Sequence, residues 1–232
     1  MWLLVGCAAP VQAPVKLERP EDTAADVARG PLAFRFPLAD RALFEQLVGV
    51  DHDPVVYGEG IEGAQCTNYD GRGFPWCYDS HDGSDFLLDG GFDVMDAGST
   101  PIVAAADGVV VATEASNYDR CHATFEGVDC DGYPMEANYV ILEHEGGYST
   151  RYWHMKTDSV VVAVGDTVRC GDTLGLVGSS GYSSMPHLHF ELQDAAGMTT
   201  DPYAGAWSQP ETWWVEQGEA EGMPGSDCWA GG

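Results

Sequence analysis

Short runs of alternating apolar and polar residues fill the second half of the chain, and glycine, aspartate, asparagine and serine separate them. Successive side chains of a strand point to opposite faces of its sheet, so each run predicts a strand with one buried face. The runs cover residues 102–106, 109–114, 139–143, 149–154, 160–164, 173–177 and 187–193. Their close spacing, with no long helical period between them, predicts an all-β domain built on a mainly antiparallel β-sheet.

One segment ahead of these runs has helical spacing instead. Asp40 can cap a helix N-terminus, and apolar residues follow it at Leu43, Phe44, Leu47 and Val48. This pattern predicts a short N-terminal helix. Loop-rich extensions are expected around the sheet: residues 51–80 are rich in glycine, aspartate and tyrosine, and the Trp-rich tail after residue 207 is expected to pack across the domain.

The length and charge narrow the function classes. A chain of 232 residues suits one domain with extensions, and its formal net charge of -27 is spread over the predicted loops and tails. This charge argues against nucleic acid as a partner and against binding to anionic lipid by charge. No apolar run approaches the roughly 20 residues that span a bilayer.

The cysteines indicate an exported protein. Leu4-Val5-Gly6-Cys7 resembles the lipobox of bacterial lipoproteins, which predicts a signal over 1–7, a lipid anchor at Cys7 and a flexible Ala/Pro-rich linker over 8–30. The apolar run before Cys7 is shorter than the ~7–15 residues of a usual signal, so a chance match is the alternative. The other six cysteines form an even set, as expected in an oxidising compartment. Short loops favour the pairs Cys66–Cys77 and Cys121–Cys130, which leaves Cys170–Cys228.

Three histidines and one aspartate are the candidate catalytic and metal-binding residues. On a strand, His187 and His189 lie on one face while the residues beside them face the core. Two imidazoles on one buried face are costly unless a metal or substrate binds them. His81 and Asp85 are good zinc ligands, and a His, Asp and His set leaves the fourth tetrahedral position open for water, as in catalytic zinc sites.

Three motifs carry a family resemblance. His81-x-Gly83-x-Asp85, Tyr152-Trp153-His154 and the segment G-S-S-G-Y-S-S-M-P-H-L-H-F-E over 178–191 occur in order, with Gly-rich connections between them. Together they resemble the lysostaphin-type (LytM-like) zinc endopeptidases. The resemblance covers about 74–204, which leaves an N-terminal extension over 31–73 and a C-terminal tail over 205–232.

The resemblance implies a site and an activity. It assigns His81, Asp85 and His189 as the ligands of Zn²⁺, beneath a narrow groove on the sheet. His154 and His187 are then the catalytic pair, one taking a proton from water and the other stabilising the oxyanion; which does which stays open. The implied protein is an exported zinc endopeptidase of the bacterial cell envelope, acting on peptidoglycan peptides or on a protein substrate.

Two alternatives accompany this assignment. Asp89 and Asp93 lie where the first motif would fall without an insertion, but Asp89 stands where the family has histidine. His81 and Asp85 are favoured because they retain the imidazole ligand that suits zinc. Residues 86–97 are then an inserted loop. This loop and the 115–137 loop are expected to shape the groove. The second alternative is a catalytically inactive module that binds cell wall or regulates amidases, because some relatives have lost zinc ligands.

The remaining candidates have ordinary explanations. Tyr152 either donates a hydrogen bond to substrate or only packs, and Gly83 is expected to allow a tight turn. His144 is expected to shape a turn, and two further histidines, His52 and His122, lie in polar loops. The carboxylates around the Cys121–Cys130 loop lack the regular spacing of a calcium site and are expected to be solvated: Asp119, Asp129 and Asp131.

Overall fold

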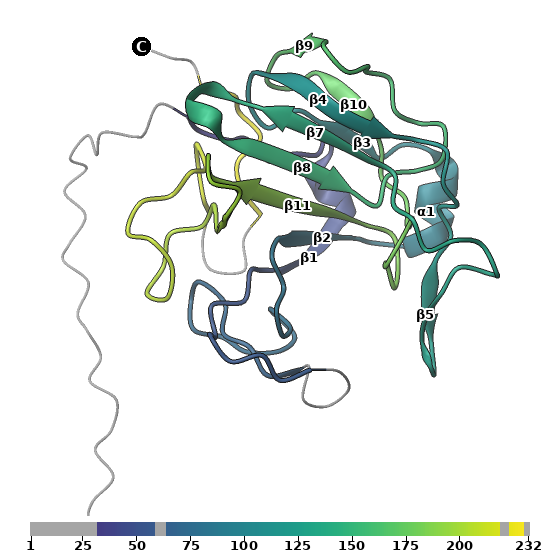
Figure 1. Cartoon of the computed structure of the whole chain (residues 1–232), viewed down its shortest axis with the longest axis horizontal. Helices are drawn as coiled ribbons and strands as arrows, with labels where there is room; N and C mark the ends of the chain where they lie inside the picture. The colour runs from purple at the N-terminus through teal and green to yellow at the C-terminus, as the bar shows by residue number, and fades with distance from the viewer. Residues whose placement is uncertain (1–31, 59–63, 219–222, 230–232) are drawn as a thin grey trace, which may run out of the picture.

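An eight-stranded antiparallel sheet forms the centre of the computed structural model, which describes residues 32–58, 64–218 and 223–229. The strands run in the order β1-β2-β11-β8-β7-β4-β9, and β12 pairs with β11 (Figure 1). Their bounds are β1 Phe44–Val48, β2 Ser84–Leu88, β4 Gly108–Glu114, β7 Tyr139–Glu143, β8 Ser149–Trp153, β9 Thr167–Val168, β11 His187–Gln193 and β12 Thr199–Thr200. The predicted all-β, mainly antiparallel fold is confirmed.

Two small sheets and little helix complete the described part of the chain. β10 (Thr173–Leu176) pairs with β3 (Pro101–Val103), and β5 (His122–Thr124) pairs with β6 (Gly127–Asp129). In Figure 1, β3 and β10 lie behind the main sheet, and β5 projects away from it on the side of α1. The helical elements are η1 Arg41–Leu43, α1 Gly91–Ala97 and η3 Glu145–Gly147.

Most of the predicted strands are present. β7 and β11 have the predicted bounds, whereas β3 is shorter than predicted. The run 160–164 is not a strand, which corrects the prediction. Val160 and Val162 pack against the core and Val161 is exposed, so alternation holds over these three residues; it ends before Val164, which is exposed. An alternating run that borders the core therefore satisfies the strand pattern without a ladder partner.

The predicted N-terminal helix is only one 3₁₀ turn long. Asp40 caps η1 as expected, since its carboxylate accepts from the amide of Ala42 at 3.0 Å. The residues after it form β1, whose register against β2 shifts between Phe44 and Gln46. This irregularity interrupts the period of two, so that Phe44 and Leu47 are both buried. The three-residue spacing that predicted a helix is therefore the signature of a bulged strand.

The expected inserted loop over 86–97 is also corrected. Phe86 and Leu88 are buried in β2, and the turn after them leads into α1, which Met95 anchors with 1% exposure. The 115–137 loop contains the β5–β6 hairpin. The segment 86–97 therefore consists mostly of regular elements, whereas 115–137 is a loop that carries one short hairpin.

Residues from outside 74–204 complete the core. Phe34 and Trp214 are fully buried and their backbones form a bridge, so both ends of the described chain pack onto the sheet. The three expected disulfides are present: Cys66–Cys77, Cys121–Cys130 and Cys170–Cys228. Across the described residues, no helix has the length and apolar character to cross a membrane. Cys7 and the linker 8–30 lie outside the described residues.

Candidate active site

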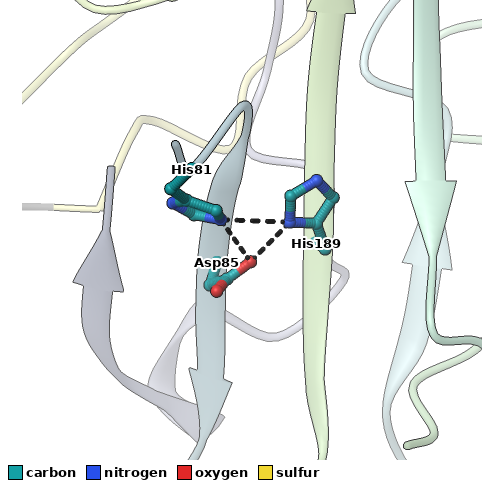
Figure 2. A group of neighbouring side chains, drawn as sticks. All are labelled: His81, Asp85 and His189. Atoms are coloured by element: carbon teal, nitrogen blue, oxygen red, sulfur yellow. Dashed lines mark hydrogen bonds and ion pairs between the residues drawn. The ribbon is translucent and has the colours of Figure 1, made fainter. Parts of the chain in front are cut away.

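Adjacent strands bring three of the predicted site residues together. Asp85 on β2 lies directly opposite His189 on β11 in the antiparallel ladder, and His81 lies in the turn that leads into β2. Figure 2 shows the three side chains converging on one point. The Nε2 of His81 is 3.2 Å from both Nδ1 of His189 and Oδ1 of Asp85, and the last two atoms are 2.7 Å apart. All three residues are buried.

A hydrogen bond of His81 and the ion-pair contacts of His189 indicate which nitrogens face this point. Nδ1 of His81 is 2.7 Å from the carbonyl of Gly49, which can only accept, so the proton sits on Nδ1 and Nε2 keeps its lone pair. Nε2 of His189 faces two carboxylates, Asp82 at 3.5 Å and Glu191 at 3.4 Å. A proton on that Nε2 leaves the lone pair of His189 on Nδ1, the atom that faces His81 and Asp85.

The converging atoms fit a zinc ion. Two imidazole lone pairs and a carboxylate oxygen repel one another in a buried site unless a proton or cation lies among them. Three N/O ligands at ~2.0–2.1 Å from one tetrahedral ion stand about 3.3 Å apart, and the observed separations of 2.7 to 3.2 Å are close to this. Their ligand atoms form the group best suited to a metal among the described residues by burial and donor type.

The charges of the group are strongly coupled. Burial disfavours the carboxylate form of Asp85, but His81 and His187 outweigh it and hold the pKa of Asp85 well below its ordinary value. Burial likewise opposes a charge on His189, whereas Asp82, Asp85 and Glu191 outweigh it and raise the pKa of His189. Asp85 is therefore ionised and able to bind a cation.

The two candidate catalytic histidines lie beside this group. The rings of His154 and His187 have centroids 4.6 Å apart, and Nε2 of His187 is 3.5 Å from Oδ1 of Asp85. Each ring donates from Nδ1 to a backbone carbonyl, His154 to Ser180 and His187 to Met185, both at 2.7 Å. In the neutral form of each ring, the lone pair is therefore on Nε2.

The backbone and surroundings of His154 suit a proton acceptor. His154 follows β8 with φ 63°, a left-handed conformation that a non-glycine residue rarely adopts and that is common at functional sites. Burial and the imidazoles of His187 and His189 hold the pKa of His154 well below its ordinary value. Its ring is therefore neutral near pH 7.

Comparison with known proteins identifies a family to which this sequence is similar. Residues 88–202 match the family model described as Peptidase family M23. The domain belongs to peptidase family M23. The match begins after His81 and Asp85 and contains His154, His187 and His189.

Relatives of the M23 domain include cell-wall peptidases. The chain is 33% identical over 112 residues to peptidoglycan DD-endopeptidase ShyA of Vibrio cholerae, covering 48% of this chain and 20% of that protein. It is 34% identical over 112 residues to glycyl-glycine endopeptidase ALE-1 of Staphylococcus capitis, covering 48% and 24%. The chain thus spans less than a quarter of the length of these relatives. Among solved structures, the catalytic domain of lysostaphin from Staphylococcus simulans is 27% identical with a TM-score of 0.37, covering 63% of this chain and 89% of that chain.

Other predicted residues of the M23 domain lie outside the centre. Asp89 and Asp93 are exposed and do not belong to the group, so the rival register does not build this site. Tyr152 is fully buried, and its hydroxyl accepts from the amide of Ala105 at 2.9 Å. Of its two expected roles, the packing one is therefore present. A regular strand would place Tyr152 and His154 on one face of the sheet. The left-handed backbone of His154 ends this alternation, so Tyr152 faces the core while His154 faces the site.

Three features of the candidate site were not expected from the sequence. Tyr78 stacks on the ring of His81 with centroids 4.2 Å apart, and no sequence motif marked it. Asp82 and Glu191 flank His189, and their positions next to His81 and two residues beyond His189 could have indicated this. Gly83 has no positive φ, and its lack of a side chain instead allows a close approach, since a Cβ there would lie 2.6 Å from the His189 ring.

A cavity of about 270 Å³ opens beside His81. Its lining is mostly polar and acidic: Val50, Asp51, His52, Ser80, His81, Asp82, Thr199 and Asp201. His52, expected to be an ordinary loop residue, pairs with the buried Asp201 at 2.7 Å across this lining. Space for part of a substrate therefore adjoins the candidate centre.

Proposed function

We propose that this M23 domain is a zinc metalloendopeptidase that hydrolyses peptide bonds, with His81, Asp85 and His189 as the metal ligands. The observation that supports this proposal most is the convergence of three buried lone-pair donors within 2.7 to 3.2 Å of one another. With a metal bound, the Gly49 carbonyl accepts the remaining proton of His81 and the carboxylates of Asp82 and Glu191 face the remaining proton of His189, so both lone pairs point at the metal.

The catalytic roles fall to the neighbouring histidines. When bound, zinc supplies Lewis-acid polarisation of the scissile carbonyl and lowers the pKa of a water molecule to about 7. In its neutral form each of His154 and His187 presents an unprotonated Nε2, so either can accept the proton from the attacking water and return it to the leaving amine. The ring that has accepted this proton can donate a hydrogen bond from its Nε2–H to the oxyanion before the proton passes to the leaving amine. Backbone carbonyls hold both rings in place, which keeps this pair oriented.

The proposed substrate is the peptide part of bacterial peptidoglycan. The relatives named as peptidoglycan and glycyl-glycine endopeptidases support this class of substrate. Digestion of proteins is the alternative enzyme activity, and the assay below includes it. An inactive wall-binding or regulatory module is less well supported, because all five expected histidine and aspartate positions are filled and clustered.

The proposed location is the bacterial cell envelope. Three disulfides within the described residues support export to an oxidising compartment. Anchoring through a lipid on Cys7 is part of this proposal. Incorporation of a labelled fatty acid, lost in Cys7→Ser, would support the anchor; equal labelling of both proteins, or none, would contradict it.

Metal analysis of matched variants tests the enzyme proposal first. We expect about one zinc per chain in the wild type and in Asp89→Ala, and a loss of zinc in His81→Ala, since Asp89 is exposed and His81 is a proposed ligand. Purified peptidoglycan and casein are then digested with each protein, and the fragments are identified by mass spectrometry. Absence of zinc in the reconstituted wild type would contradict the enzyme and favour the regulatory module. Cleavage of casein alone would contradict the peptidoglycan substrate.

A further inference from the structure

Glu191 lies beside His189 on the side of the ring that faces away from Asp85. The two residues are two positions apart on β11 and therefore share a face of the sheet. Oε1 of Glu191 is 3.4 Å from Nε2 of His189, and the glutamate is only 6% exposed. The ring of His189 thus lies between two carboxylates, Asp85 at Nδ1 and Glu191 at Nε2.

Neighbouring donors hold Glu191 in this position. Nε2 of Gln193 donates to Oε2 of Glu191 at 3.1 Å, and Nε of Arg151 lies 3.7 Å from the same oxygen. These contacts stabilise the negative charge of Glu191, whose burial without polar partners would be energetically unfavourable. They also occupy Oε2, which leaves Oε1 free to accept a proton from His189.

The position of that proton decides whether His189 can bind a metal. A neutral imidazole carries one proton, and the nitrogen without it is the ligand. We propose that Glu191 is a positioning residue that keeps the proton of His189 on Nε2 and so keeps the lone pair of Nδ1 directed at the zinc. This role rests on the zinc centre proposed above. It makes zinc, His189 and Glu191 a continuous chain of contacts, of a kind that tunes metal affinity in proteins.

Asp82 is the weaker of the two acceptors. Its Oδ1 is 3.5 Å from the same Nε2, but its side chain is 60% exposed, so water competes for its charge. Asp82, His189 and Glu191 could also hold a second cation between them. A second cation would require removal of the Nε2 proton, which is the opposite of the positioning role, and the zinc stoichiometry distinguishes the two.

Zinc affinity of the full chain provides the first test. Chelator competition is measured for the wild type, Glu191→Gln, Asp82→Asn and a charge-matched control, Glu143→Gln, whose carboxylate is exposed on β7. We expect Glu191→Gln to weaken zinc binding about 10- to 100-fold with one zinc still bound per chain. Asp82→Asn should weaken it less, and Glu143→Gln should leave it unchanged.

The imidazole proton itself provides a second test that needs no variant. In the zinc-loaded wild type, ¹⁵N–¹H NMR should find the proton of His189 on Nε2. A proton on Nδ1 instead would overturn the positioning role even where Glu191→Gln fails to fold.

The outcomes separate the two proposals. Zinc bound equally by the wild type and by folded Glu191→Gln, a proton on Nδ1, or two zinc ions per chain would overturn the positioning role while leaving the zinc centre standing. A wild type that binds no zinc would overturn the zinc centre and the role of Glu191 with it.

Discussion

Gly83 is the position where a single methyl group should disable the candidate centre. A Cβ at this residue would lie 2.6 Å from both Cε1 and Nε2 of His189 and 2.9 Å from the carbonyl oxygen of Phe190. Ordinary contact begins at 3.4 Å, so in Gly83→Ala the His189 ring must move by about 0.8 Å. Metal–ligand distances tolerate only about ±0.2 Å. The Phe190 carbonyl belongs to the β11 backbone, which cannot retreat without disturbing the sheet.

Thermal unfolding with and without zinc measures both consequences. Overpacking of this kind costs roughly 1–3 kcal/mol, which for a chain of this size lowers Tm by roughly 2–12 °C in the metal-free protein. Zinc at 100 times the wild-type Kd should stabilise the wild type by about 2.7 kcal/mol. If the displaced ring weakens binding 100-fold, the same zinc concentration stabilises Gly83→Ala by only about 0.4 kcal/mol.

A second glycine provides the matched control. Gly73 is exposed and has no positive φ, and a Cβ there would meet the Cys66 carbonyl oxygen at 3.4 Å, which is ordinary contact. Gly73→Ala should therefore keep the zinc-dependent rise in Tm and lose little stability. Should Gly83→Ala keep the wild-type Tm and the full zinc-dependent rise, the close approach between Gly83 and His189 would be refuted as a requirement of the site.

Three further predictions concern other parts of the molecule. His154→Gln should retain zinc, because His154 is not among the three donors, yet lose about 10²–10⁴-fold in peptidoglycan turnover; loss of the metal would contradict its assigned role. Burial lowers the pKa of His144 despite its hydrogen bond to the Asp107 carbonyl, so the unfolded chain takes up a proton that the folded protein lacks as pH falls below about 6.5. The contribution of neutral His144 to the free energy of unfolding is therefore present above that pH and lost below it. His144→Gln should show a shallower fall of Tm from pH 7 to 5 than the wild type, and equal slopes would contradict this. Trp214→Ala should cost about 3–5 kcal/mol in urea unfolding because the ring is fully buried in the core, and a change under about 1 kcal/mol would show that the tail is not part of it.

The elements that sequence reasoning located are those whose pattern reflects one regular contact. β11 has the predicted bounds because it pairs with β2 on one edge and with β8 on the other without interruption, and both its faces are buried. β7 was located for a similar reason, with alternating burial along its length. The disulfides followed from short loops, which restrict the partners that a cysteine can reach.

The errors arose where tertiary contacts interrupt a local pattern. The bulge in β1 produces a three-residue spacing that is typical of a helix. β2 and α1 were hidden because the segment 86–97 was interpreted by alignment to a motif rather than by its own apolar residues. Residues 160–162 alternate because they border the core, although no strand pairs with them. For β1 and for residues 160–162, the buried residues were identified correctly, but more than one structure can produce their spacing.

The composition of the candidate site could be predicted, whereas its proton positions could not. The five residues are identified by motifs, but the nitrogen that each histidine presents depends on carbonyls contributed by distant loops, Gly49 for His81 and Ser180 for His154. A chain with the same five residues and a donor in place of either carbonyl would present a protonated nitrogen to the centre. It would then bind no zinc or accept no proton. The polar partners behind the ligands, rather than the ligands alone, should therefore distinguish active members of this family from inactive ones.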